Sequence, residues 1–134
     1  GSWQSAKNPT LRDIHEYVIV GSKGSFARKR AGEDTISKEQ FLDATVSIWE
    51  ILPESARRVG HPAPFPVELP RRLIDLYSFK DDLILDPFMG SGSTAVAAVE
   101  AERHYVGYEL DPAYIEIAER RIDEGRIGTR TKRA

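Results

Sequence analysis

Apolar runs of strand length alternate with segments of helical periodicity along the second half of the chain. Helices are predicted for Val67–Tyr77, for Thr94–Ala101 and for the stretch from Asp111 to Gly125, and strands for Leu83–Leu85 and Tyr105–Tyr108. The Leu83–Leu85 run is apolar at every position, which is typical of a strand buried on both faces. The order helix, strand, helix, strand, helix predicts an α/β fold with a parallel sheet.

Single residues set the expected ends and faces of these helices. Asp111 and Pro112 form a good N-cap and first-turn pair, and Gly125 predicts the end of the last helix. Four side chains of the first helix are expected to turn inward: Leu69, Leu73, Leu76 and Tyr77.

The first half of the chain has weaker patterns. Glu16–Val20 is rich in residues that favour strands and predicts a short strand, followed by a turn at Gly21–Gly24 and a polar loop. Ser37 and Gln40 have the spacing of a capping box, which predicts a helix that Pro53 ends. The apolar stripe of this helix comprises Phe41, Leu42, Thr45, Ile48 and Trp49.

Composition limits the class of protein. The chain has 134 residues and a mass of 15.0 kDa, with 40% hydrophobic and 30% charged residues, as in one folded domain. It has no Cys, no basic-then-apolar leader and no apolar run near the ~20 residues of a membrane span. We therefore expect a cytoplasmic protein without disulfides or membrane contact. The three His share no metal-ligand spacing, so no metal site is predicted.

Basic residues are clustered, although the formal net charge is only −2. One cluster lies in the polar loop after the first predicted strand, where it could contact DNA phosphates, which need local rather than net positive charge. These candidate DNA-binding residues are Lys23, Arg28, Lys29 and Arg30.

A loop containing two glycines follows the Leu83–Leu85 run and is the strongest indication of chemistry in the sequence. The segment Asp86-Pro87-Phe88-Met89-Gly90-Ser91-Gly92-Ser93-Thr94 lies between a predicted strand and a helix of small residues. Glycine lets a ligand approach the backbone, and the helix N-terminus offers free N–H groups. Glu109 ends the next strand, nineteen residues after Gly90, where a carboxylate can accept both hydroxyls of an adenosine ribose. This order of elements predicts a nucleotide-like cofactor.

Two classes of cofactor fit the spacing. Gly90-x-Gly92-x-x-Ala95 is a permitted variant of the dinucleotide fingerprint, so a nicotinamide-dependent enzyme is one alternative. Asp86 argues against it, because its carboxylate would point into the space of a pyrophosphate. S-adenosylmethionine carries an ammonium and a sulfonium but no phosphate, so a carboxylate favours it. Phe88 and Met89 can pack on its adenosine or methionine moiety.

The same loop resembles the cofactor loop of DNA amino-methyltransferases, which methylate adenine N6 or cytosine N4. His61-Pro62-Ala63-Pro64-Phe65-Pro66 is similar to the cofactor-binding segment before that loop in the permuted branch of this family. Val106-Gly107-Tyr108-Glu109-Leu110-Asp111 is similar to the ribose-binding strand, and residues 8–17 resemble the end of the catalytic half. The resemblance covers nearly the whole chain. It implies a partial Rossmann-like methyltransferase fold, an incomplete parallel sheet with flanking helices, and double-stranded DNA as partner of the full enzyme.

The resemblance also implies roles for matching positions. Asp86 would hold the methionine end of the cofactor, Glu109 would hold the ribose, and Leu110 would pack against adenine. Phe65 and Phe88 would line the pocket, with plain core packing as the alternative for both rings; many relatives have Lys in place of Phe65. The implied cofactor-binding set is Phe65, Asp86, Pro87, Phe88, Gly90, Ser91, Gly92, Glu109 and Leu110.

The motif that acts on the base in this family does not occur in the chain. Those enzymes use an Asp/Asn/Ser-Pro-Pro-aromatic tetrapeptide, which accepts hydrogen bonds from the amine and stacks on the flipped-out base. Asn8-Pro9-Thr10, Asp86-Pro87-Phe88 and Asp111-Pro112-Ala113-Tyr114 are near matches that lack the double proline. We therefore expect the carboxy-terminal part of a methyltransferase, with no catalytic residue of its own and no activity alone.

Four segments follow from this interpretation. Residues 1–24 would end the catalytic half, 25–58 would be a target-recognition or connector segment, 59–125 would bind the cofactor, and 126–134 would form a basic tail. Without a neighbouring strand, Leu83–Leu85 would leave an open sheet edge. That edge predicts self-association, or recruitment of an amino-terminal catalytic half in cis or in trans. A non-catalytic interaction module is the remaining alternative.

Overall fold

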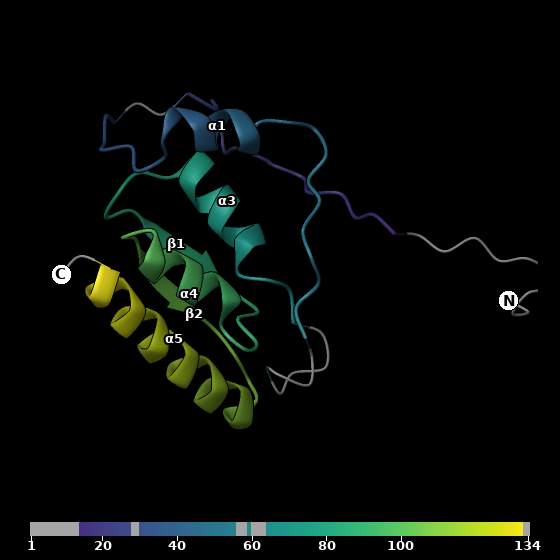
Figure 1. Cartoon of the computed structure of the whole chain (residues 1–134), viewed down its shortest axis with the longest axis vertical. Coiled ribbons are helices and arrows are strands. Elements are labelled where there is room, and N and C mark those ends of the chain that lie inside the picture. The colour runs from purple at the N-terminus through teal and green to yellow at the C-terminus, as the bar shows by residue number, and fades with distance from the viewer. Residues whose placement is uncertain (1–13, 28–29, 56–58, 60–63, 133–134) are drawn as a thin grey trace, which may run out of the picture. The chain divides into compact units, whose positions relative to one another are not determined.

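The computed structural model describes residues 14–27, 30–55, 59 and 64–132, which are coloured in Figure 1. The chain divides into two units, residues 1–31 and 32–134. In the first unit, the described residues contain no helix or strand, so the predicted strand at Glu16–Val20 is wrong. Tyr17 and Ile19 are 85% and 92% exposed. A strand forms only where a neighbouring strand bonds its backbone, and none is present in this described segment. A bend at Gly24, with a φ of 100°, lies where the turn was predicted.

The second unit contains one strand–helix–strand crossover. Strands β1 (Leu83–Asp86) and β2 (His104–Gly107) pair in parallel, with Leu83 opposite His104. Helix α4 (Ser93–Glu100) connects them. These elements confirm the predicted α/β fold with parallel strands, and the sheet has these two strands in the described part of the chain.

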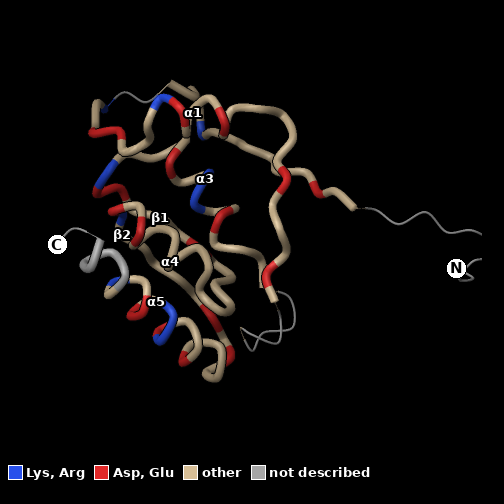
Figure 2. Tube along the Cα trace, viewed as in Figure 1, with Lys and Arg blue, Asp and Glu red and all other residues tan. Residues whose placement is uncertain are grey.

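Helix α4 is the centre of the core. It packs against both strands, α3 (Glu68–Tyr77) and α5 (Pro112–Lys132), and Figure 1 shows it between these two helices. Its small side chains allow the close approach on several sides. Figure 2 shows Lys, Arg, Asp and Glu along α5, whereas α4 is almost free of charge. The buried core residues of α4 are Ala95, Val96, Ala97 and Ala98.

Helix α1 (Lys38–Ala44) begins as predicted and ends earlier than predicted. The Ser37 hydroxyl accepts from the Gln40 N–H at 3.2 Å, and the Gln40 side chain accepts from the Ser37 N–H at 2.9 Å, which confirms the capping box. The helix ends at Ala44 rather than near Pro53. The Trp49 indole donates to the Ala44 carbonyl at 3.0 Å, so the chain turns back and satisfies an acceptor at the helix end.

Helix α5 is longer than predicted, and Gly125 does not cap it. The helix continues to Lys132, so the described residues after 125 are helical and not a separate tail. A Cβ at Gly125 would lie 3.4 Å from a methyl group of Val96 on α4. Gly125 therefore marks the place where two helices approach closely, which a sequence pattern cannot distinguish from a helix end.

The inward face of α3 differs in part from the prediction. Pro70 and Ile74 are the buried residues of this helix, and Ile74 contacts the apolar cluster around Ala97. Tyr77 is 53% exposed, so its expected inward position is wrong. The three predicted leucines of α3 are only partly buried.

Strand β1 is covered on one face only, and the prediction of burial on both faces is wrong. Ile84 packs against the α4 core, whereas Leu83 and Leu85 are 65% and 61% exposed. Successive side chains of a strand point to opposite faces, so the exposed pair lies on the face opposite α4. Val106, which pairs with Leu85, is 37% exposed. We call Leu83, Leu85 and Val106 the open face of the sheet.

A buried guanidinium fixes the start of β2. Arg103 is 4% exposed and donates to the Ser78 carbonyl at 2.7 Å and to the Ser78 hydroxyl at 3.1 Å. It also donates to the hydroxyl of Thr35, and its burial lowers the pKa of the guanidinium, an effect that Asp75 opposes. The loop before α1 is thereby held against the end of α3.

Candidate cofactor site

A cavity of about 210 Å³ lies beside the turn between β1 and α4, at the carboxyl ends of the two strands. In α/β folds ligands bind outside this edge of the sheet. The walls come from the segment before α3, the turn itself, the residues after β2 and the first turn of α5. The lining residues are Pro64, Phe65, Phe88, Met89, Gly90, Ser91, Ser93, Glu109 and Tyr114.

Glycine is required in the turn for conformation and for space. Gly90 and Gly92 have φ values of 50° and 82°, which side chains rarely adopt. A Cβ at Gly92 would lie only 2.8 Å from the Cβ of Ala118 on α5. The Gly92 N–H also donates to the Met89 carbonyl at 2.9 Å, which closes the turn. The backbone of the turn is therefore seated directly on α5.

Glu109 connects the turn to the end of β2. One carboxylate oxygen accepts from the Gly90 N–H at 2.8 Å, and the other accepts from the N–H groups of Leu110 and Asp111 at 2.8 and 2.9 Å. Hydrogen bonds from backbone N–H groups to a carboxylate are stronger than those between neutral groups. The carboxylate is therefore part of the cavity wall and not a free surface group.

Met89 also connects the glycine turn to the residues after β2. Its N–H donates to the Tyr108 carbonyl at 2.9 Å. Its Sδ occupies the place that a Cβ of Gly107 would need. Gly107 thus leaves the space that the Met89 side chain occupies in the cavity lining.

The two predicted aromatic residues lie on the cavity. Phe65 is 40% and Phe88 is 86% exposed, so core packing is wrong as an account of Phe88. The Phe65 carbonyl accepts from the Ser93 hydroxyl at 2.8 Å, which attaches the segment before α3 to the start of α4. Exposed rings beside a glycine turn are available to a ligand.

The structure brings together about half of the predicted cofactor-binding set. Five of these residues line the cavity: Phe65, Phe88, Gly90, Ser91 and Glu109. Asp86 does not line it; one of its oxygens accepts from the Phe88 N–H at 3.0 Å. Pro87, Gly92 and Leu110 also lie outside the lining, and Leu110 is 99% exposed.

The predicted cofactor-binding set did not include four residues that line the cavity, Pro64, Met89, Ser93 and Tyr114, nor Arg121, which contacts the turn. Tyr114 lines the cavity from the first turn of α5, three residues after the N-cap Asp111, and that spacing was the available signal. Ser93 is 2% exposed and bonds the Phe65 carbonyl. Arg121 donates to both turn serines from α5, and nothing in the sequence pattern separates it from the surrounding basic residues.

The candidate DNA-binding loop is described only in part. Lys23 and Arg30 are exposed, and Arg28 and Lys29 lie outside the described residues. Among the described residues, no group of three or more acidic or His side chains could hold a metal ion. No helix described here is both long and apolar enough to cross a membrane.

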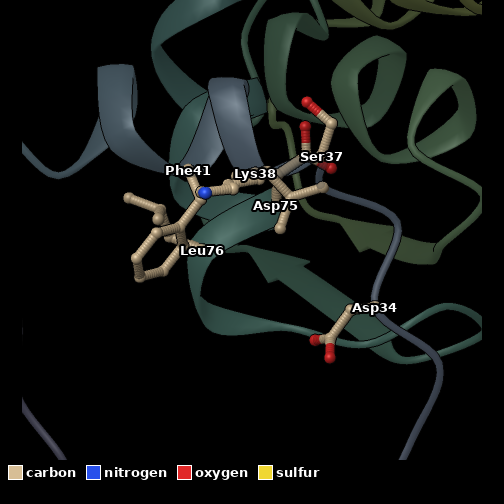
Figure 3. A pocket seen from close by; sticks show the side chains of 7 residues that line it. Asp34, Ser37, Lys38, Phe41, Asp75 and Leu76 are labelled. Carbon is tan, nitrogen blue, oxygen red and sulfur yellow. The ribbon is translucent and has the colours of Figure 1, made fainter.

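A second cavity of about 300 Å³ lies between α1 and α3. Figure 3 shows Phe41 and Leu76 on one side of it and Asp34 on the other. Its partly buried carboxylate, Asp75, accepts from Arg71 at 2.6 Å, so it is committed to an ion pair. This cavity has none of the glycine-turn geometry of the first one.

Comparison with known protein families assigns the chain. The DNA methylase family model matches residues 1–120. The chain belongs to the DNA methylase family. The match includes the glycine turn, both strands and the start of α5, so the family assignment and the cavity concern the same part of the molecule.

Individual proteins similar to this chain are described as DNA methyltransferases or methylases. The Type II methyltransferase M.BglI of Bacillus subtilis is 35% identical over 90% of this chain, and M.MthZI of Methanothermobacter thermautotrophicus is 33% identical over 92%. A protein from Thermus thermophilus that is described as a putative DNA modification methylase, and was solved in complex with S-adenosyl-L-methionine, is 37% identical over 71% of this chain and 36% of its own, with a TM-score of 0.60. The chain spans only 34–41% of the length of the first curated relatives. The fold is therefore that of part of a methyltransferase.

Proposed function

We propose that this chain is the S-adenosylmethionine-binding part of a DNA methyltransferase that modifies the exocyclic amine of adenine (N6) or cytosine (N4). The hydrogen bond from Gly90 to Glu109 carries this proposal. It places a carboxylate beside the glycine turn, where a dinucleotide enzyme would bind phosphate. The family assignment and the S-adenosylmethionine complex of the Thermus thermophilus relative support the same cofactor.

The chemistry of the cavity fits a cationic cofactor without phosphate. The described lining contains the rings of Phe65, Phe88 and Tyr114, one carboxylate, and no Lys or Arg. Aromatic faces attract cations, and they also stack on adenine. A phosphate at the turn would meet the Glu109 carboxylate and compete with it for the Gly90 N–H. These groups disfavour a nicotinamide dinucleotide.

The chain would bind and orient the cofactor. Asp86 would hold the ammonium of the methionine end, Glu109 would hold the ribose, and Leu110 would pack against adenine. Phe65 and Phe88 would enclose the bound molecule. The cofactor would supply an electrophilic methyl group on its sulfonium, for in-line transfer to the amine nitrogen. No residue of the chain is assigned to act on the base.

A second polypeptide segment would complete the site. The cavity is smaller than the ~300–1,000 Å³ usual for ligand pockets, which supports a wall supplied from elsewhere. The open face and the outer edge of β1 support the same conclusion, because parallel sheets normally have both faces covered. We propose that the amino-terminal catalytic half, with its Pro-Pro-aromatic tetrapeptide, covers this face in cis or in trans. Self-association is expected where that half is absent.

Double-stranded DNA is the proposed substrate of the complete enzyme, which would act in the cytoplasm. The exposure of Lys23 and Arg30 supports a phosphate contact by this loop.

Calorimetric titration of the chain with S-adenosylmethionine, and separately with NAD⁺, tests the proposed cofactor. We expect weak but saturable binding of S-adenosylmethionine, because one wall of the site would be supplied from elsewhere, and no binding of NAD⁺. Tighter binding of NAD⁺ would favour the dinucleotide alternative. Binding of neither, by a chain whose circular dichroism shows it to be folded, would favour a non-catalytic interaction module.

A further inference from the structure

One guanidinium outside the cavity lining bonds the glycine turn from α5. Arg121 lies in α5, and its Nη1 donates to the Ser91 carbonyl at 2.6 Å and to the Ser91 hydroxyl at 2.9 Å. Its two terminal nitrogens lie 3.3 and 3.4 Å from the Ser93 hydroxyl oxygen. A single charged group therefore bonds both residues that flank Gly92.

The bonds of Arg121 extend to a third segment of the chain. The Ser93 hydroxyl, which accepts from Arg121, donates to the Phe65 carbonyl at 2.8 Å. Ser91, Ser93 and Phe65 all line the cofactor cavity, whereas Arg121 does not. Arg121 thus reaches the site through other residues, and it connects two of its walls, the glycine turn and the segment before α3, to α5.

The geometry requires a guanidinium and not simply a positive charge. Ser91 and Ser93 are 4% and 2% exposed, so their polar groups have little access to water and need partners. The planar fork of Arg serves several acceptors at once, whereas the ammonium of Lys is a single point on a flexible stem. Charged donors also make the stronger hydrogen bonds.

We propose that Arg121 is a positioning residue for the cofactor loop. It holds residues 90–93 and the Phe65 backbone in the binding arrangement before the cofactor arrives, so that less ordering opposes binding. The expected effect of Arg121 on cofactor affinity rests on the proposed function. Its consequence for the order of the turn is independent of any ligand.

Amide hydrogen exchange of the chain without cofactor tests the ordering. The Gly90 and Gly92 N–H groups are both hydrogen-bonded, so their exchange reports on the turn. In Arg121→Met we expect these two amides to exchange on the order of tenfold faster, with α4 and β2 unchanged. Arg121→Lys should lie between wild type and Arg121→Met. Arg120→Met is the matched control, because Arg120 is the exposed neighbour on the same helix, and it should exchange like wild type.

S-adenosylmethionine titration of the same variants tests the consequence for binding. The dissociation constant should rise about tenfold in Arg121→Met and stay unchanged in Arg120→Met. Unchanged exchange at Gly90 and Gly92, or equal acceleration throughout α4 and β2, would overturn the positioning role. Failure of the wild-type chain to bind the cofactor would refute the proposed function, and the exchange comparison would still decide on Arg121. If Arg121→Met does not fold, Ser93→Ala removes the shared hydroxyl without altering α5, and faster exchange at Gly92 is then the required result.

Discussion

The carboxylate of Glu109 accepts a hydrogen bond from the N–H of Gly90 at 2.8 Å. The two residues lie in the loops that follow the two paired strands, so the contact joins both loops into one wall of the cavity. The same carboxylate accepts from Leu110 and Asp111 at the start of α5. Glu109, which was expected only to hold a ribose, therefore also links the glycine turn to the start of α5.

Replacement of Glu109 should show both roles. Glu109→Gln keeps one oxygen acceptor and therefore part of the three backbone hydrogen bonds, whereas Glu109→Ala removes all of them. S-adenosylmethionine affinity should fall less in Glu109→Gln than in Glu109→Ala, where we expect a loss of ~1–3 kcal/mol or more. Calorimetric titration measures the order. The reverse order would contradict both roles, because Glu109→Ala removes every acceptor that the loops or the ribose could use.

Asp86→Ala should remove detectable S-adenosylmethionine binding and leave the melting temperature nearly unchanged. The lost charge-assisted hydrogen bond to the ammonium is worth ~1.5–3 kcal/mol of affinity. Stability should change little, because the Asp86 side chain makes one bond, to the Phe88 N–H, at an exposed part of the loop. Asp123→Ala, at an exposed position of α5, is the control. Unaltered affinity would refute the assignment of Asp86.

Gly92→Ala should destabilise the fold. The φ of 82° is strained for any side chain, and the new methyl group would lie 2.8 Å from Ala118. We expect a loss of ~1–3 kcal/mol in the free energy of unfolding, measured by urea titration. Gly21→Ala is the matched control, since a Cβ at Gly21 meets nothing within 4 Å, and it should change stability by less than ~0.5 kcal/mol. Equal stability of the two variants would show that the turn relaxes freely.

Leu85→Lys should reduce self-association of the chain. Leu85 is 61% exposed at the centre of the open face, and a charge there opposes apolar contact and edge-to-edge strand pairing. Sedimentation velocity should show wild type shifting toward larger species with concentration and Leu85→Lys remaining monomeric. Leu52→Lys, at a residue 86% exposed and outside the sheet, should behave as wild type. If wild type is monomeric at all concentrations, the open face does not bind a second copy.

The 134-residue chain alone should not methylate DNA. It has no Pro-Pro-aromatic tetrapeptide, so nothing orients the amine nitrogen or holds a flipped base against its unstacking cost of a few kcal/mol. A radiolabelled-methyl transfer assay with mixed-sequence DNA, using protein free of host methyltransferases, measures this. Turnover above a no-protein control would contradict the prediction. Activity that appears only when the amino-terminal half is added would support it.

Elements with a local cause were predicted correctly from the sequence. Three such features depend on residues close together in the chain: the capping box of Ser37 and Gln40, the cap of α5 by Asp111, which accepts from the Ala113 N–H, and the strand–glycine–helix order around Gly90. The position of the cavity beside the glycine turn could be predicted for the same reason, since the turn and the acid after the next strand belong to one crossover.

The remaining features depend on tertiary contacts between segments that are distant in the sequence, and local sequence patterns do not reveal these contacts. Glu16–Val20 has a strand composition and no strand in the structure, because composition does not supply a hydrogen-bonding neighbour. Glycine is typical of a helix end, but Gly125 lies inside α5, where the absence of a side chain allows the close approach of Val96. The sequence by itself determined the parallel α/β crossover and the position of the glycine turn. Only the tertiary structure decided that Leu83 and Leu85 lie exposed, that Glu109 bonds Gly90, and that Arg121 holds the turn, because each of these depends on which distant groups come into contact.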